Sequence, residues 1–259
     1  MPVIDSYKQG TPSWADLTTT DQSGAKAFYE SVFGWSYEDN PVGDGVYYTM
    51  ARIDGHDIAG ISPMPDERPP QMPSTWNTYL TVDDVDATVE KVARAGGSVL
   101  AAPFDVMGSG RMAVIADSTG AAVSLWQAND HIGATVKDEP GSMTWNECFT
   151  DDIRAAATFY DEVLGVSHSS ADTGGPEPYT TLEVDGQGVA GFFFKDPEAH
   201  GRMPNMWLVY FASSDINETA VRIRGADGKV LNGPFETPFG QVIVAQDPQG
   251  AVFQVIEST

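Results

Sequence analysis

The sequence predicts an α+β protein built from four βαβββ modules, grouped as two similar cup-shaped domains in tandem. Two observations lead to this prediction. The first is that the chain matches itself at a nearly constant offset along most of its length. The second is that each half holds two successive runs of strand, amphipathic helix and further strands, so that each half contains two modules.

The internal match is close enough to align the two halves residue by residue. Residues 28–34 (FYESVFG) match residues 159–165 (FYDEVLG) at an offset of 131. Towards the end the offset becomes 130, where residues 117–121 match residues 247–251. An offset that holds over most of the chain indicates a duplicated domain.

A short segment rich in turn-forming residues separates the two copies. It contains Gly133, Pro140 and Gly141, which is typical of a connection between domains. We therefore expect a first domain at 1–130, a linker at 131–142 and a second domain at 143–259.

The first module of each half begins with a strand, at 13–18 or 144–149, that runs into an amphipathic helix. Apolar residues recur in the helix at the i, i+3, i+4 and i+7 spacing of one face. Side chains that cap the first turn precede each helix, and a glycine follows it. The expected N-caps are Thr20 or Asp21 and Asp151 or Asp152, and the expected C-terminal caps are Gly34 and Gly165.

The second module of each half repeats this order. A strand at 75–82 leads to a helix at 84–95, and in the second copy a strand at 206–212 leads to a helix at 215–224. Three shorter strands are expected after each helix. The modules might pair within each half, or the first with the fourth and the second with the third, and the sequence leaves both pairings open.

Composition and charge exclude several classes of function. The 259 residues carry a formal net charge of −23, which repels phosphate backbones and anionic lipid, so neither nucleic acid nor a membrane is an expected partner. Cys148 is the single cysteine, which excludes an intramolecular disulfide. The first ten residues do not resemble a signal peptide. We expect a cytoplasmic protein, monomeric or homodimeric, that acts on a small molecule.

Several motifs carry a resemblance to a known family. They are the helix ending at 28–35 (FYESVFGW), the turn at 247–250 (DPQG) and the strand ending at 126–129 (WQAN). With the order of the modules, they make the chain similar to the glyoxalase/bleomycin-resistance/dioxygenase (vicinal oxygen chelate) superfamily. More narrowly, the chain resembles the tandem-domain actinobacterial 27-kDa antigen (CFP30B-like) proteins. The resemblance implies two sheets, each curled into a cup that holds a ligand.

The same resemblance indicates where a metal would be bound, and the residues there are unsuited to it. Metal-using relatives place His and Glu at four strand positions of a cup. No His, Glu or Asp stands at the corresponding positions, so we expect no metal and no other cofactor. Those positions are Trp14, about Gly60, Asn77 and Ser124 in the first half and Trp145, about Gly191, Leu208 and Gln254 in the second.

The four histidines, His56, His131, His168 and His200, are expected in turns and loops. The order His131, His200, Glu257 is loosely similar to the ligand order of extradiol dioxygenases, but none of the three falls on a mapped strand position. We interpret this order as a coincidence.

Alternation along the strands predicts what fills the cups instead. If Trp14 and Trp145 point inward, so do Asp16 and Glu147, and each carboxyl then lies among aromatic side chains that raise its pKa. The expected acid–base residues are Asp16 and Glu147. The expected ligand-binding residues are Trp14, Asn77, Tyr79, Ser124 and Trp126, and Trp145, Leu208, Tyr210 and Gln254.

Three functions are compatible with such cups. The first is binding of a small, planar, partly apolar molecule without a metal. The second is a metal-independent lyase, isomerase or hydroxylase-labelled enzyme, with Asp16 or Glu147 as base and Tyr79 or Tyr210 as proton donor. The third is a metal-dependent lactoylglutathione lyase with Arg111 as a substrate contact. Two structural interpretations also stay open, namely tryptophans that fill the cups as core and carboxylates that serve only as hydrogen-bond acceptors.

Overall fold

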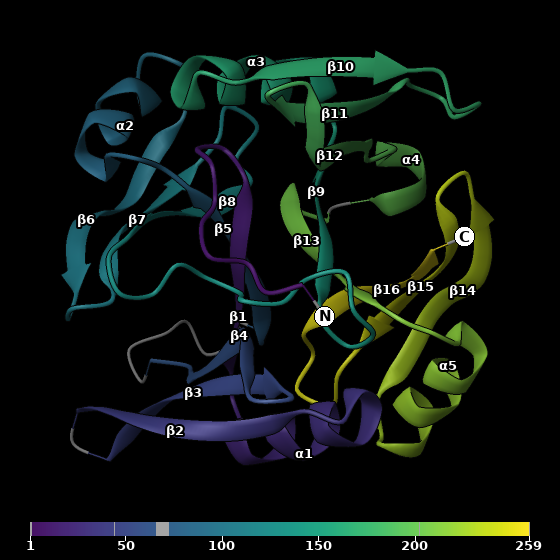
Figure 1. The fold of residues 1–259 in the computed structure, drawn as a ribbon. Coiled ribbons are helices and arrows are strands. Elements are labelled where there is room, and N and C mark those ends of the chain that lie inside the picture. The colour runs from purple at the N-terminus through teal and green to yellow at the C-terminus, as the bar shows by residue number, and fades with distance from the viewer. Residues whose placement is uncertain (1, 44, 66–72, 202, 259) are drawn as a thin grey trace.

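The computed structural model describes residues 2–43, 45–65, 73–201 and 203–258 (Figure 1). Each half contains two βαβββ modules, which confirms the predicted fold class. The elements of the first half are β1 (Pro12–Thr19), α1 (Gln22–Phe33), β2 (Ser36–Gly43), β3 (Val46–Ile53), β4 (His56–Pro63), β5 (Thr75–Thr81), α2 (Val85–Val92), β6 (Ser98–Val106), β7 (Gly110–Ala116) and β8 (Ala122–Ala128).

The second half repeats this order, and a short helix that the sequence did not predict, α4, lies between its strands β12 and β13. Its elements are β9 (Met143–Thr150), α3 (Ile153–Leu164), β10 (Ser167–Ala171), β11 (Tyr179–Val184), β12 (Gln187–Phe194), α4 (Pro197–His200), β13 (Met206–Ala212), α5 (Ile216–Gly225), β14 (Lys229–Thr237), β15 (Gly240–Gln246) and β16 (Val252–Ser258).

Each half forms one eight-stranded sheet of its own. The strand order is β2-β3-β4-β1-β5-β8-β7-β6 in the first half and β10-β11-β12-β9-β13-β16-β15-β14 in the second. The first strands of the two modules, β1 and β5, pair antiparallel at the centre, and each also pairs in parallel with the last strand of its own module. The two modules of one half therefore close into one cup. Of the two pairings that the sequence left open, the structure has the pairing of modules within each half.

The first helix of each half begins and ends where capping chemistry places its termini. Asp21 and Asp152 are the N-caps, and each side chain accepts a hydrogen bond from the backbone N–H three residues later. Gly34 and Gly165 follow the helices with φ of 76° and 71°, a left-handed conformation that costs glycine little.

The helices pair the modules across the two halves. Figure 1 shows α1 beside α5 and α2 beside α3. One buried cluster joins Phe28 and Tyr29 of α1 to Ile223 of α5 and Phe253 of β16. A second cluster joins the β5–β8 module to α3. The sheets thus close within halves, while the cores behind them are shared between halves.

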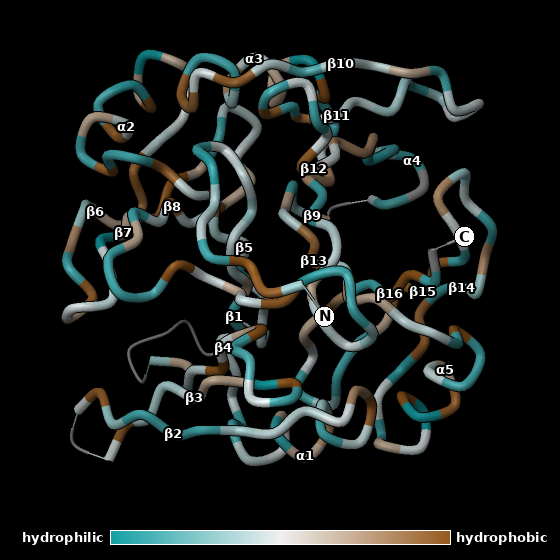
Figure 2. Tube along the Cα trace, viewed as in Figure 1, coloured by the Kyte–Doolittle hydropathy of each residue, from teal (hydrophilic) through white to brown (hydrophobic). Residues whose placement is uncertain are grey.

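The hydropathy of the strands differs between the centre and the edge of a sheet. Figure 2 shows hydrophobic residues along the central strand β13, whereas the edge strand β2 is largely hydrophilic. All five residues of β10 are exposed. The segment predicted as a linker holds no helix or strand, but Ala134 and Val136 within it are fully buried. Among the described residues, no helix is long and apolar enough to cross a membrane.

Candidate functional site

The centre of the first cup is a buried carboxylate surrounded by hydrogen-bond donors. Asp16 lies on β1 and is only 5% exposed. Its Oδ2 accepts hydrogen bonds from the hydroxyls of Tyr79 at 2.8 Å and Tyr48 at 3.3 Å, and its Oδ1 accepts one from the amide of Asn77 at 2.8 Å. The Trp14 indole N–H donates to the Tyr48 hydroxyl at 2.8 Å. Three side chains, Tyr48 of β3 and Asn77 and Tyr79 of β5, thus donate to one acid, and Trp14 of β1 donates to one of the three donors.

The second cup repeats this network on the equivalent strands. Glu147 of β9 is also 5% exposed. Its two carboxylate oxygens accept hydrogen bonds from the hydroxyls of Tyr179 at 2.9 Å and Tyr210 at 2.6 Å. The Trp145 indole N–H donates to the Tyr179 hydroxyl at 3.0 Å. Of the aromatic residues predicted for this cup, Tyr210 contacts the acid directly and Trp145 is linked to it through Tyr179.

Tyr48 and Tyr179 were not among the predicted site residues, although each joins the tryptophan to the carboxylate of its cup. A signal for them exists in the sequence, because the two tyrosines stand 131 positions apart, at the offset of the repeat. Period-two alternation along β3 and β11 alone does not show that their hydroxyls reach β1 and β9.

Two glycines make room for these hydroxyls. Gly60 of β4 faces Asp16 in the register of the sheet, and Gly191 of β12 faces Glu147. A Cβ at Gly60 would overlap the Tyr48 hydroxyl, and a Cβ at Gly191 would overlap that of Tyr179. At these two of the eight mapped positions, a tyrosine hydroxyl occupies the space that a ligand side chain would need.

Burial governs the ionisation of the two acids. Desolvation raises the pKa of Asp16 and of Glu147, and the hydrogen bonds from their phenol and amide neighbours lower it in part. Burial and the nearby carboxylate raise the pKa of Tyr79 and Tyr210 well above the ordinary tyrosine value. The phenols therefore stay protonated and donate to an acid that ionises less readily than one in water.

The remaining predicted residues lie around these networks but differ between halves. Ser124 of β8 lies near Tyr79 and Gln254 of β16 lies near Tyr210, and each lowers the pKa of that tyrosine in part. Leu208, the counterpart of Asn77, is partly buried and is apolar, so Glu147 lacks an amide donor there. Trp126 packs with Trp14 and Tyr79 in an apolar cluster of the first cup.

The donors present in the cups do not fit a divalent metal. A metal ion needs several nitrogen, oxygen or sulfur ligands directed at one point. Each cup supplies one carboxylate, and its oxygens already accept hydrogen bonds from phenols. In the described part of the chain, no group of three or more His, Cys, Asp and Glu side chains could hold a metal ion.

Three of the four histidines lie in regular elements, and not in the turns and loops predicted for them: His56 begins β4, His168 lies on β10 and His200 ends α4. The His131 ring packs edge-on against Trp14, with ring centroids 4.6 Å apart, and is half-buried rather than free in a loop. His168 pairs with Asp161 at 2.6 Å on the surface. Glu257 accepts a hydrogen bond from the backbone N–H of Ile216.

Arg111, the residue considered for a glutathione-type substrate, has its guanidinium engaged at the protein surface. It forms ion pairs with Asp86 at 2.7 Å and Asp105 at 2.9 Å. The two acids use the donors that would otherwise recognise a substrate carboxylate.

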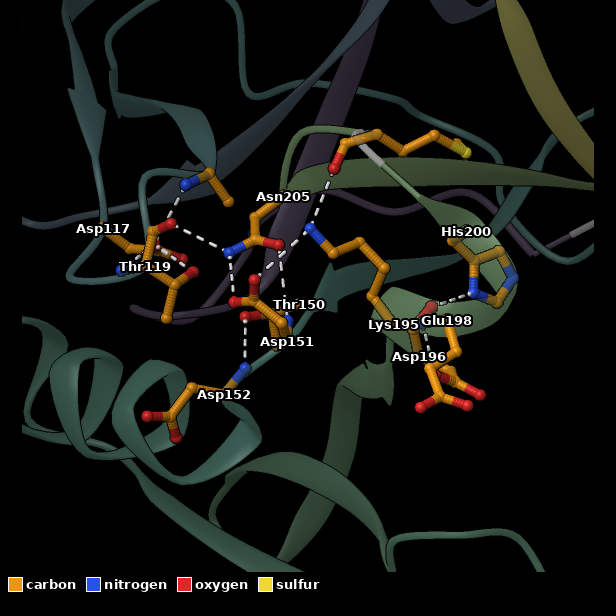
Figure 3. Close-up of polar contacts among 12 residues, drawn as sticks. Asp117, Thr119, Thr150, Asp151, Asp152, Lys195, Asp196, Glu198, His200 and Asn205 are labelled. Carbon is orange, nitrogen blue, oxygen red and sulfur yellow. Dashed lines mark hydrogen bonds and ion pairs between the residues drawn. The ribbon is translucent and has the colours of Figure 1, made fainter.

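A separate polar cluster lies where the second half meets the first (Figure 3). Lys195 is 5% exposed, and its ammonium donates to the backbone oxygen of Met203 at 2.8 Å and lies 3.5 Å from Asp151. The Asn205 amide donates both to Asp151 and to the backbone oxygen of Thr119 in the first half. These contacts link the two halves and lie outside both carboxylate networks.

Comparisons with known proteins identify the class to which this fold and site belong. The model of the Glyoxalase/Bleomycin resistance protein/Dioxygenase superfamily matches residues 11–125 and again residues 130–255. The chain belongs to this superfamily and carries one copy of its domain in each half.

Two curated relatives are similar along their whole length. One is a Mycobacterium tuberculosis protein named "Putative glyoxylase CFP32", 48% identical over 99% of this chain and 98% of that protein. The other is "Anthracycline biosynthesis protein DnrV" of Streptomyces peucetius, 36% identical over 97% of this chain and 94% of that protein.

Solved structures share the fold at low sequence identity. The 2,3-dioxygenase LapB from Pseudomonas sp. KL28 superimposes with a TM-score of 0.67 at 13% identity, covering 97% of this chain and 94% of that one. A Mn(II)-bound glyoxalase from Novosphingobium aromaticivorans gives a TM-score of 0.64 at 16% identity, covering 97% and 83%. These likenesses concern the fold alone.

Proposed function

We propose that this protein binds a small, planar, partly apolar organic molecule in an aromatic cup, without a metal ion. The observation that carries the proposal is the network of tryptophan, two tyrosines and one buried carboxylate, present around both Asp16 and Glu147. Aromatic walls favour flat rings, and a few fixed polar groups orient a ligand within such walls.

The character of the donors and acceptors supports a neutral ligand with one polar edge. The carboxylate is held among protonated phenols, so a ligand hydroxyl or N–H could exchange for one phenol contact without a new charge being buried. The name of one relative, an anthracycline biosynthesis protein, supports fused-ring compounds as the first class to test.

A screen of neutral fused-ring compounds tests this proposal. Acridone, umbelliferone and quinizarin would be titrated into the intact chain while tryptophan fluorescence is followed. We expect saturable quenching by at least one of them, weakened in Glu147→Gln or in Asp16→Asn according to which cup holds the compound, and little change in Asp185→Asn, whose side chain is 68% exposed. No saturable signal with any compound would contradict the proposal.

A second candidate is metal-independent acid–base catalysis at the same carboxylates. It is favoured by the 2.6 Å contact between the Tyr210 hydroxyl and Glu147, together with the raised pKa of that acid. An ionised Glu147 would accept a proton from the substrate, and Tyr210 would donate its hydroxyl proton to a developing oxyanion. Unchanged turnover of a candidate substrate in the double variant Asp16→Asn, Glu147→Gln would rule out this role.

A lactoylglutathione lyase has the least support of the three functions. It requires a metal, which the donor set of either cup does not fit, and a free cation for the peptide carboxylates of its substrate. Arg111, the candidate for that contact, is already paired with two acids.

A further inference from the structure

The two cups share one network but differ in what covers it. In the first cup, Trp14 is 3% exposed and Trp126 is 5% exposed. The His131 ring lies against both, with its centroid 4.6 Å from that of Trp14 and 5.9 Å from that of Trp126. Met50 and Met112 pack against the same cluster. The chain itself thus occupies the aromatic surface of this cup.

Backbone hydrogen bonds hold that cover in place. The Trp126 indole donates to the backbone oxygen of His131 at 2.9 Å. The backbone N–H of Ala134 donates to Ser13 of β1 at 2.7 Å, and the Tyr7 hydroxyl donates to the backbone oxygen of Ala134 at 2.5 Å. Ala134 is fully buried. A ligand could reach Trp14 only if several of these contacts broke together.

The second cup exposes its aromatic surface. Trp145 and Leu208 are partly exposed where Trp14 and its neighbours are covered. Phe193 is 47% exposed and Phe239 is 54% exposed. Exposed aromatic side chains near a buried polar network are typical of a ligand site rather than of a solvated face.

Both exposed phenylalanines contact aromatic side chains of the second half. Phe193 stacks on Phe149, with centroids 6.0 Å apart, and its place on β12 is two residues beyond Gly191, on the same face. Phe239, at the tip of the hairpin between β14 and β15, contacts the Tyr179 ring at 5.5 Å. Because β11 and this hairpin stand near opposite ends of the sheet, that contact spans the cup.

The first half has no equivalent of this rim at the corresponding positions. The counterparts of Phe149 and Phe193 are Thr18 and Ser62, and the tip of the corresponding hairpin carries Met107. The aromatic rim thus belongs to the second copy of the duplicated domain. The cover formed by His131 lies over the first copy.

We propose that the second cup alone receives the ligand, one molecule per chain, with Phe239 closing over a planar ring held between Trp145 and Phe193. This inference rests on the proposed function and assigns it to one of the two cups. The Glu147 network provides the polar contact, and the first cup serves as a filled structural core.

The experiment uses acridone, a neutral, fluorescent, planar compound with one N–H and one carbonyl. Equilibrium dialysis with the intact chain gives the stoichiometry, and acridone emission gives the affinity of the variants. We expect one acridone per chain and a Kd raised about tenfold in Phe239→Ala, from the loss of one stacked ring. The matched variant Met107→Ala, at the equivalent hairpin of the first half, should keep the affinity within about twofold.

Phe239 and Met107 are both largely exposed, so neither variant should affect folding. Two acridones per chain, or an unchanged Kd in Phe239→Ala, would overturn the inference while leaving the proposed function standing. An unchanged Kd combined with a shift from dimer to monomer in Phe239→Ala would instead make this face a contact between copies of the chain. No saturable binding to the intact chain would contradict the proposed function and this inference together.

Discussion

The Tyr210 hydroxyl donates a 2.6 Å hydrogen bond to Glu147, and its repeat counterpart Tyr79 makes the same bond to Asp16 at 2.8 Å. Each pair joins the first strands of the two modules of one half, which are neighbours in the sheet. The bond therefore links the two modules of one half and also sets the chemistry at the centre of the cup.

Removing one of these donors should destabilise the fold. In Tyr210→Phe, Glu147 keeps only Tyr179 as a side-chain donor, and leaving a buried acceptor less satisfied costs about 1–3 kcal/mol of unfolding free energy. Urea unfolding of Tyr210→Phe against Tyr47→Phe, whose ring is 45% exposed, measures this loss. Equal stability of the two variants would mean that the bond contributes nothing.

The raised pKa values of Asp16 and Glu147 predict how stability depends on pH. Burial makes each acid harder to ionise in the folded state, so each contributes stability below its unfolded-state pKa of about 4, and this contribution is lost as pH rises through the folded-state pKa. The double variant Asp16→Asn, Glu147→Gln should therefore show a smaller loss of unfolding free energy than the natural chain between about pH 4 and pH 7. Urea unfolding at both pH values checks this, and identical pH dependence would contradict it.

The glycine opposite Glu147 should be intolerant of a side chain. A Cβ at Gly191 would overlap the Tyr179 hydroxyl, so Gly191→Ala must displace that ring and weaken its bond to Glu147. We expect a loss of about 1–3 kcal/mol in unfolding free energy. Gly43→Ala is the control, because a Cβ there meets open space and its φ is not positive. Thermal unfolding that does not separate the two variants would show that the space is not needed.

Neither half should be stable by itself. In the intact chain, Phe28 and Tyr29 of α1 pack against residues of α5 and β16, and the Tyr29 hydroxyl bonds Asp247 at 3.1 Å. Residues 1–130 alone would expose this surface, so we expect no cooperative unfolding transition by circular dichroism. A folded, monomeric half with a sharp transition would show that the shared cores are dispensable.

Much of the fold could be predicted because most elements occur in both halves, so that the prediction for one half can be checked against the other. A helix that appears twice, with Asp21 and Asp152 before it and Gly34 and Gly165 after it, is supported by independent local chemistry in each copy. The short helix α4 escaped prediction because its four residues are too few to show a helical spacing of apolar residues, and the exposed strand β10 carries no apolar alternation.

The candidate site could be predicted only in part. Strand alternation placed Asp16 beside Tyr79 and Glu147 beside Tyr210, since these residues share a face of neighbouring strands. It did not show that Tyr48 reaches Asp16 across β4, because that contact depends on the missing side chain at Gly60. The shared cores and the cover formed by His131 depend on long-range packing, which no local pattern encodes.

The most direct test of the central claim, that a cup of this protein binds a planar molecule without a metal, is one acridone titration made under two conditions. The chain is first dialysed exhaustively against EDTA, and the titration is then repeated with added Mn²⁺. We predict saturable binding in both, with a Kd that agrees within about twofold. Saturable binding that occurs only after Mn²⁺ is restored would contradict the claim and would return a metal to the centre of the site.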